Sequence, residues 1–313
     1  MFWLLAHAIG ADPGELADAP EVADVPARVV SAGSVHNSAP RHVEERWTVP
    51  TAVVSAIRAV ASRPLGERVA VASESFLGLP YLNDAAGEGD VQDPDPPSRY
   101  DTFDCLTFVE EVLSLAMASD PLNAPRTRNQ FRYRGEASYV DRRHFMEAEW
   151  IPDAIANGLL ADITSAVGRA STLEKDVSLE TWRSWGRRSL FRVPESRLPV
   201  GRWALNYLDL DAAVEAAPRI PAGALVVTLR SSRAWVPVVT THISLVVSSG
   251  PTAVMRHATR MGTKKVRDDK MSWYAAHLRE YTNWPALGLV VLMPREQGPR
   301  VSALAEADAL RYR

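Results

Sequence analysis

Apolar residues recur at helical spacing in two early segments of the chain. Within residues 50–63, Val53, Ile57 and Val60 fall three or four positions apart, which places their side chains on one face of a helix. A second segment of this kind covers residues 67–76. The pattern therefore predicts two amphipathic helices at the start of the folded region.

A stronger apolar pattern lies within residues 101–117. Residues such as Val109 and Leu113 mark a buried helical face, and Asp104 stands just ahead of it. A short acidic side chain is favoured at the N-cap, because it accepts hydrogen bonds from the first free backbone N–H groups. The sequence thus predicts a helix in which Cys105 is the first residue.

The segments around this helix are less regular. Residues 83–100 are rich in Gly, Asp and Pro and predict a loop, and residues 125–143 are polar and rich in arginine. A helix is expected over residues 144–157, ended by Gly158. Residues 173–217 show a mixed pattern that predicts no particular element.

The C-terminal part has the short, β-branched runs that are typical of strands. They cover residues 224–229, 243–247, 253–257 and 287–293, and turn residues separate them. We expect a small antiparallel sheet, followed by an exposed helix over residues 301–313. Helices first and strands later predict an α+β fold.

The first part of the chain lacks these patterns. Residues 1–47 are rich in Ala, Asp, Pro and Ser and predict an extension, so residues 48–313 are interpreted as a single domain. Residues 1–11 are apolar and end in small residues, without a basic start. We interpret them as a remnant export signal, which predicts a periplasmic or secreted bacterial protein.

The composition and charge of the chain limit the kinds of partner that it can bind. The 313 residues are 46% hydrophobic and 23% charged with a net charge of -3, as in an ordinary soluble protein. Basic residues form no block, which disfavours nucleic acid as a partner, and no apolar run approaches the ~20 residues that span a bilayer.

The chain has one cysteine, Cys105. A single cysteine excludes an internal disulfide and a zinc site built from several thiolates, but it allows a lone nucleophile. At a helix N-terminus, the helix dipole and free N–H groups lower a thiol pKa and can receive an oxyanion. The alternative is an inert, buried cysteine, although Thr102, Asp104 and Thr107 make this position polar.

Two histidines on predicted strands are candidates for the base that such a nucleophile needs. His242 and His257 are fifteen positions apart, and neighbouring strands can bring their imidazoles together. His242 would exchange a proton with Cys105, and His257 would hold its tautomer. Each histidine alone could instead be a half-buried structural side chain, and we interpret His144 as one on a helix surface.

Several segments together resemble the NlpC-type papain-like cysteine hydrolases of bacterial cell-wall metabolism, and more narrowly their N-acetylmuramoyl-L-alanine amidase-like branch. The similarity covers about residues 49–293. The segments are Phe76-Leu-Gly-Leu-Pro-Tyr81, Phe103-Asp-Cys-Leu-Thr-Phe-Val-Glu110, Phe131-Arg-Tyr-Arg-Gly135, Arg143-His144, Trp150-Ile-Pro-Asp153, Thr241-His242-Ile243-Ser244 and Arg256-His257-Ala258-Thr259.

The resemblance implies a papain-like core in which helices, one headed by the cysteine, pack on a small antiparallel sheet. It implies hydrolysis of an amide bond in a muropeptide or peptidoglycan fragment, most simply N-acetylmuramoyl-L-alanine, without metal or other cofactor. Tyr81 matches a tyrosine that helps to bind the carbonyl oxygen. The candidate substrate-binding residues are Tyr81, Asp104, Tyr133, Arg134, Tyr139 and Arg143.

The sequence departs from the family pattern at three places. Ala224 replaces an aspartate after Gly223, Ser244 replaces a glycine two residues after His242, and Ala154 replaces an asparagine. None is a member of the proposed triad, so substrate preference is affected more than activity. A cell-wall peptide endopeptidase, a catalytically silent muropeptide-binding module and a metallohydrolase using both histidines remain as alternatives.

Overall fold

The structure, a computed structural model, describes residues 48–298. The predicted N-terminal extension and the predicted C-terminal helix over residues 301–313 lie outside these residues. The helices are α3 (Thr51–Ala59), α4 (Leu65–Glu74), α5 (Cys105–Met117), α6 (Ala124–Arg132), α7 (Ile151–Ala156), α8 (Thr164–Val167), α9 (Leu179–Ser184), α10 (Leu210–Ala216) and α11 (Met271–Arg279). A π-helical turn, η3 (Met146–Trp150), precedes α7, and single 3₁₀ turns are η2 (Pro121–Asn123), η4 (Arg188–Leu190), η5 (Glu195–Arg197) and η6 (Ala217–Arg219).

A six-stranded antiparallel sheet organises the domain, with the strand order β1-β8-β4-β5-β6-β7. The strands are β1 (Leu160–Asp162), β4 (Leu225–Arg230), β5 (Thr240–Ser248), β6 (Val254–Thr259), β7 (Lys265–Lys270) and β8 (Ala286–Pro294). The four strands predicted from sequence, which correspond to β4, β5, β6 and β8, are confirmed. The two edge strands were not predicted, because β1 has only three residues and β7 is mostly charged, so neither has an apolar periodicity.

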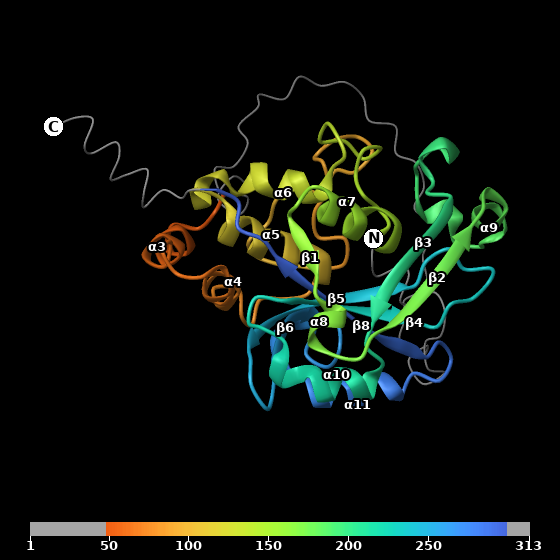
Figure 1. The fold of residues 1–313 in the computed structure, drawn as a ribbon. Coiled ribbons are helices and arrows are strands. Elements are labelled where there is room, and N and C mark those ends of the chain that lie inside the picture. Colours follow the sequence, from red (N-terminus) through yellow and green to blue (C-terminus); the bar gives the residue numbers. More distant parts are fainter. Residues whose placement is uncertain (1–47, 299–313) are drawn as a thin grey trace, which may run out of the picture.

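Helices cover both faces of this sheet (Figure 1). On one face α4, α5 and α6 pack over a core that includes Phe108 and Ile243. On the other face α10 and α11 pack over a second core, which includes Val226 and Tyr274. The α+β class predicted from sequence is confirmed, and α5 lies between the other helices and the middle of the sheet.

A two-stranded hairpin extends from this body. It consists of β2 (Ser171–Val177) and β3 (Gly201–Tyr207), and α9 lies between its strands in the sequence (Figure 1). A third core cluster, rich in aromatic residues, holds this region together and includes Trp182, Trp185 and Phe191. The region therefore has its own apolar support beside the main sheet.

Close backbone contact explains why Gly223 is a glycine. Its φ of +88° is one that L side chains rarely adopt, and an added Cβ would lie 2.6 Å from the Cα of Gly66. This contact joins α4 to the start of β4. The aspartate that the family often has after Gly223 is therefore dispensable for the turn, whereas the glycine is not.

Candidate active site

Helix α5 begins where the sequence predicts, at Cys105. The side chain of Asp104 accepts hydrogen bonds from the N–H groups of Leu106 and Thr107 at 2.9 and 2.8 Å, and the Asp104 N–H donates to the Thr107 hydroxyl at 3.0 Å. This reciprocal capping box fixes the first turn of the helix. Cys105 is consequently placed at the helix N-terminus, with a residue exposure of 4%.

The thiol is not activated in the way that the sequence predicts. Burial raises the pKa of Cys105 to about 12, the neighbouring Asp104 carboxylate adds to this, and hydrogen bonding by the Ile243 N–H opposes it. The expectation of a lowered thiol pKa is therefore wrong for this resting site, because desolvation outweighs the helix dipole. The group present is a neutral thiol, which needs a base to become a nucleophile.

The two predicted histidines lie side by side. His242 on β5 and His257 on β6 are joined by a hydrogen bond of 2.7 Å between Nε2 of the first and Nδ1 of the second. Ile243 follows His242 in β5, and its backbone is close enough to the Cys105 sulfur to lower the thiol pKa, so the thiol lies beside the strand that carries His242. The structure thus joins the two predicted histidines and places Cys105 against the strand that carries the first of them.

A carboxylate that the sequence reasoning missed completes this chain of contacts. Asp269 on β7 accepts a hydrogen bond from Nε2 of His257 at 2.9 Å, and Arg267 donates to the same carboxylate at 2.8 and 2.9 Å. The segment Lys265–Lys270 is mostly charged, so no apolar pattern marks it as a strand. Its pairing with β6, which places Asp269 near His257, is a tertiary contact.

These contacts fix the protons on both imidazoles. Burial lowers the pKa of His242, as does the neighbouring His257, and burial also lowers that of His257 against the opposing effect of Asp269. Both rings are therefore neutral, and each carries one N–H. His257 donates from Nε2 to the carboxylate, so its Nδ1 must accept from His242 Nε2. Nδ1 of His242 therefore carries no proton, and its lone pair can take a proton from a thiol.

Replacing Asp269 by asparagine is expected to lower kcat about tenfold, since the carboxylate acts through His257 rather than on the reacting atoms. The carboxylate also raises the pKa of His257, so its loss should move the acid limb of the pH–rate profile to lower pH. Steady-state rates between pH 4 and 9 would test this. The matched control is Asp268→Asn, because that carboxylate pairs with Arg256 at 2.7 Å. Equal profiles for both variants would remove Asp269 from the proton chain.

Tyr81 is placed beside the thiol. It forms a β-bridge with Phe103, its hydroxyl donates to Asn83 at 3.3 Å, and its pKa is raised by burial and then by Cys105 and Asp104. A protonated phenol is a hydrogen-bond donor, as an oxyanion requires. Its predicted contact with the carbonyl oxygen of a substrate stays a prediction.

Tyr274 on α11 was not singled out from sequence. Its ring centroid lies 5.9 Å from that of His242 and 5.7 Å from that of His257, and its hydroxyl is 2.8 Å from that of Thr228. It supports both imidazoles from the sheet face opposite α5. Because α11 has only a weak apolar stripe, sequence pattern did not reveal this role.

The structure places the other predicted substrate-binding residues among protein partners. Tyr133 donates from its hydroxyl to Glu88 at 2.9 Å. Arg143 donates to Asp153 at 2.7 Å and to backbone carbonyls including that of Phe131 at 2.9 Å. These contacts hold the segment after α6. The assignment of both residues to substrate stays a prediction.

Tyr139 and Arg134 differ in accessibility. Tyr139 is 2% exposed and lies against His144, with 4.6 Å between ring centroids. The side chain of Arg134 is 38% exposed and pairs with Glu149 at 2.5 Å. Arg134 therefore has more surface that a ligand could meet, whereas Tyr139 contributes mainly to the packing of this region.

His144 is buried rather than on a helix surface, which corrects the interpretation from sequence. Burial, followed by the charge of Arg142, lowers its pKa to about 3, so the ring is neutral. Its Nε2 lies 2.6 Å from the Tyr139 carbonyl oxygen, which can only accept. The ring therefore carries its proton on Nε2 and serves as a packing and hydrogen-bonding group.

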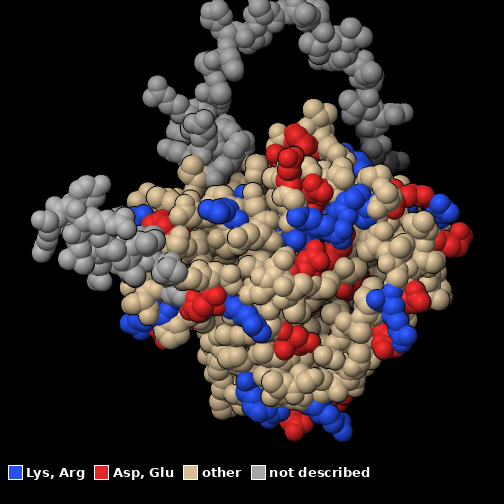
Figure 2. All heavy atoms as spheres, turned by 45° about the horizontal axis from the view of Figure 1, so that its top comes forward, with Lys and Arg blue, Asp and Glu red and all other residues tan. Residues whose placement is uncertain are grey.

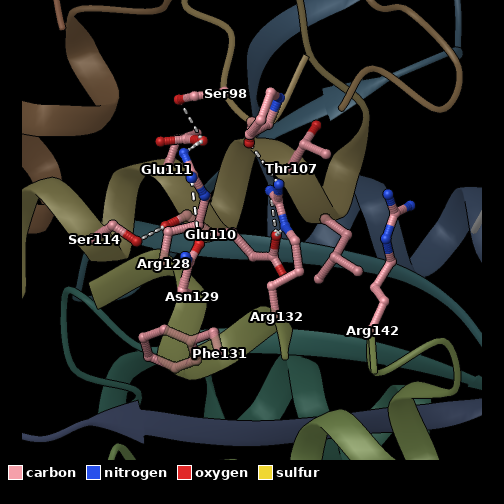
Figure 3. Close-up of polar contacts among 12 residues, drawn as sticks. Ser98, Thr107, Glu110, Glu111, Ser114, Arg128, Asn129, Phe131, Arg132 and Arg142 are labelled. Atoms are coloured by element: carbon pink, nitrogen blue, oxygen red, sulfur yellow. Dashed lines mark hydrogen bonds and ion pairs between the residues drawn. The ribbon is translucent and has the colours of Figure 1, made fainter. Parts of the chain in front are cut away.

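The arginine-rich segment forms a buried ionic network with the cysteine helix (Figure 3). Arg132 donates to Glu110 at 2.7 Å, and Arg128 donates to Glu111 at 3.2 Å. Glu111 also accepts from the hydroxyl of Ser98 at 2.9 Å. The polar segment over residues 125–143 thus includes most of a helix, α6, whose Arg128 and Arg132 side chains face the protein interior. The network ties the loop over residues 83–100 to α5.

The described residues contain no cluster that suits a metal and no membrane-spanning helix. Among residues 48–298, no three His, Cys, Asp or Glu side chains are grouped to hold an ion. Across the same residues, no helix is long and apolar enough to cross a bilayer. Basic and acidic side chains are interspersed on the face drawn in Figure 2. That face has no broad area of a single charge.

Comparison with solved structures shows which proteins share this fold, and comparison with family profiles shows the family. Three solved structures share this α+β fold at low identity. One is a Legionella pneumophila protein of the family DUF1460, with a TM-score of 0.70 and 21% identity over 84% of this chain and 99% of that chain. Another, named as an N-acetylmuramoyl-L-alanine amidase from Bacteroides uniformis, has a TM-score of 0.58 and 22% identity over 74% of this chain and 99% of the other. The third, named as a putative xylanase from Bacteroides fragilis, has a TM-score of 0.56 and 22% identity over 71% of this chain and 98% of the other.

The sequence itself identifies the family. The profile of the N-acetylmuramoyl-L-alanine amidase-like family matches residues 71–279, which is more than half of the chain. This protein therefore belongs to that family. No curated protein matches it. The matched range contains Cys105, His242, His257 and Asp269.

Proposed function

We propose that this protein is a cysteine amidase that hydrolyses the bond between the lactyl group of N-acetylmuramic acid and L-alanine in muropeptides. Membership of the amidase-like family supports an amide as the bond and a peptidoglycan fragment as the substrate. One structural observation carries the proposal: a thiol at a helix N-terminus lies beside a strand whose histidine begins a His–His–Asp chain. That arrangement supports placing the protein with the NlpC-type papain-like hydrolases.

The first step forms a thioester. Nδ1 of His242 takes the proton of Cys105 as the sulfur attacks the substrate carbonyl carbon. Asp104 occupies the N–H groups of Leu106 and Thr107, so the oxyanion accepts from the Cys105 N–H and from the Tyr81 hydroxyl, which turns from Asn83 to the substrate. Collapse of the tetrahedral intermediate breaks the C–N bond, and the departing amine of L-alanine receives the proton from His242.

The second step consumes water. His242, neutral again, takes a proton from a water molecule that attacks the thioester carbonyl. Collapse of the second intermediate breaks the C–S bond, releases the muramic acid carboxylate and returns the proton to the sulfur. No step uses a metal or cofactor. We extend the proposal to a periplasmic or secreted location, where soluble muropeptides arise.

Mass spectrometry of soluble muropeptides tests the bond that is cut. The substrates include anhydro-sugar forms, and wild-type protein is compared with Cys105→Ala, both in EDTA. We expect the wild type alone to release a free peptide that begins with L-alanine. Cleavage inside the peptide would instead establish an endopeptidase, and binding without any product would establish a silent binding module. Loss of wild-type activity in EDTA would favour a metallohydrolase.

A further inference from the structure

A hollow of about 500 Å³ opens between the loop after β4 and the segment after α9. Its volume is within the range of small-molecule sites, about 300 to 1,000 Å³. It lies outside the histidine chain and the ionic network described above. The lining residues are Trp185, Gly186, Arg187, Ser189, Leu190, Trp235 and Val236.

Trp235 is unusual for its exposure. Its exposed fraction is 63%, although it is a large aromatic residue. Trp185, by contrast, is 5% exposed and packs against Trp182 and Phe191, with ring centroids 5.9 and 5.8 Å apart. The hollow thus has one buried aromatic wall and one indole open to solvent. An exposed indole at the edge of a hollow is a typical contact for a ligand.

The loop that carries Trp235 is held at both ends. Nζ of Lys175 donates to the Arg233 carbonyl at 2.9 Å. At the other end, the Val239 N–H donates to the buried carboxylate of Glu147 at 2.8 Å, and the Thr240 hydroxyl donates to the same group. A ligand that packs on Trp235 therefore meets a loop that is already ordered, which lowers the entropy cost of binding.

The lining chemistry suits a sugar ring. A pyranose has an apolar face of C–H groups that packs on the electron-rich face of an indole, while its hydroxyl groups need donors and acceptors around the edge. Arg187 and Ser189 place side-chain polar groups at this edge, and the lining residues within the described part of the chain include no carboxylate. The mixture of flat apolar wall and polar edge therefore matches a neutral saccharide.

The hollow and the candidate active site are also close to each other in the sequence. Trp235 precedes His242 by seven residues, and β5 begins between them, at Thr240. Seven extended residues span at most about 24 Å. This length sets an upper limit on the distance between the hollow and His242, and the glycan of a muropeptide is attached on the acyl side of the amide bond that would lie at Cys105.

We propose that this hollow is a saccharide subsite that binds an N-acetylhexosamine ring of the glycan part of the substrate. The inference rests on the proposed amidase function for the identity of that glycan. The subsite would contribute to KM rather than to kcat, because the sugar is remote from the reacting atoms. It would favour muropeptides that keep their sugars over sugar-free peptides.

Paired substrates test the proposal. We expect Trp235→Ala to raise KM for a disaccharide tetrapeptide about tenfold, which is the size of one aromatic stacking contact. The same variant should leave the kinetics of the sugar-free D-lactoyl tetrapeptide unchanged, and Trp235→Phe should retain most of the affinity. The control is Leu122→Ala, which removes a 60% exposed apolar side chain elsewhere. Equal effects of Trp235→Ala on both substrates would overturn the subsite.

A second variant fills the hollow instead of removing its wall. A Cβ added at Gly186 meets no atom within 4 Å, so Gly186→Phe can be accommodated by the backbone. We expect it to weaken binding of N,N′-diacetylchitobiose, followed through tryptophan fluorescence of the Cys105→Ala protein. Chitobiose binding that depends on Trp235, with no muropeptide cleaved by the wild type, would keep the subsite and reject the amidase. Cleavage with no chitobiose binding and no effect of Trp235→Ala would reject the subsite alone.

Discussion

Replacing Cys105 by alanine is expected to lower kcat for muropeptide cleavage by at least about 10⁴-fold, because the change removes the group that forms the covalent intermediate. The Asp104 cap uses backbone N–H groups and the Thr107 side chain, so α5 should still form. Rates measured by product release, together with circular dichroism, would separate lost chemistry from lost fold. Cys105→Ser should be similarly inactive, since a hydroxyl group is far less acidic than a thiol and burial lowers the pKa of His242, which makes it a weaker base.

The control for this experiment is Ser114→Ala. Ser114 is buried on the same helix and donates to the Glu110 carbonyl, but it has no contact with the histidine chain. We expect its activity to stay near that of the wild type. Turnover by Cys105→Ala at the wild-type rate would show that another group attacks the substrate.

The raised thiol pKa also changes what a labelling experiment should show. A thiol with a pKa of about 12 is almost entirely protonated at neutral pH, and the thiolate is the reactive form. Iodoacetamide should therefore modify the resting protein slowly, in contrast to the fast labelling that a preformed thiolate would give. The attack on substrate depends on His242 as a base during the reaction, not on a thiolate that exists beforehand.

Replacing Glu110 by alanine is expected to reduce the free energy of unfolding by about 3 to 5 kcal/mol, the usual cost of removing one partner of a buried ion pair. Glu110 accepts hydrogen bonds from Arg132 at 2.7 Å and from the Trp150 indole at 3.0 Å. Its loss leaves the buried Arg132 guanidinium (Figure 3) and the buried indole N–H of Trp150 without this acceptor. Urea denaturation followed by tryptophan fluorescence measures the change.

Two further variants show whether the effect comes from the buried charge. The exposed pair of Glu67 with Arg63 provides the control, and Glu67→Ala should cost less than about 1 kcal/mol. The double variant Glu110→Leu with Arg132→Met removes both charges and should recover much of the lost stability. If it is as unstable as the two single changes added together, the ion pair is not the cause.

Local sequence determined the parts of this protein that depend on near neighbours. The start of α5 was predictable, because an N-cap at Asp104 acts on the next three residues. The strands that carry His242 and His257 were predictable from their β-branched runs. Cys105 could be identified as the candidate nucleophile because it is the single cysteine of the sequence. These features follow from chain conformation within a few residues.

Contacts between distant segments decided the rest. Asp269 joins the site only because β7 pairs with β6, and nothing in its charged neighbourhood predicts a strand. The arginines of α6 are indistinguishable from surface residues in the sequence, and only the carboxylates of α5 explain their burial. The sequence by itself thus determined that the thiol lies at the start of a helix and that the two imidazoles lie on strands. The tertiary structure decided their protonation, because a pKa depends on burial and on charges that folding brings from elsewhere.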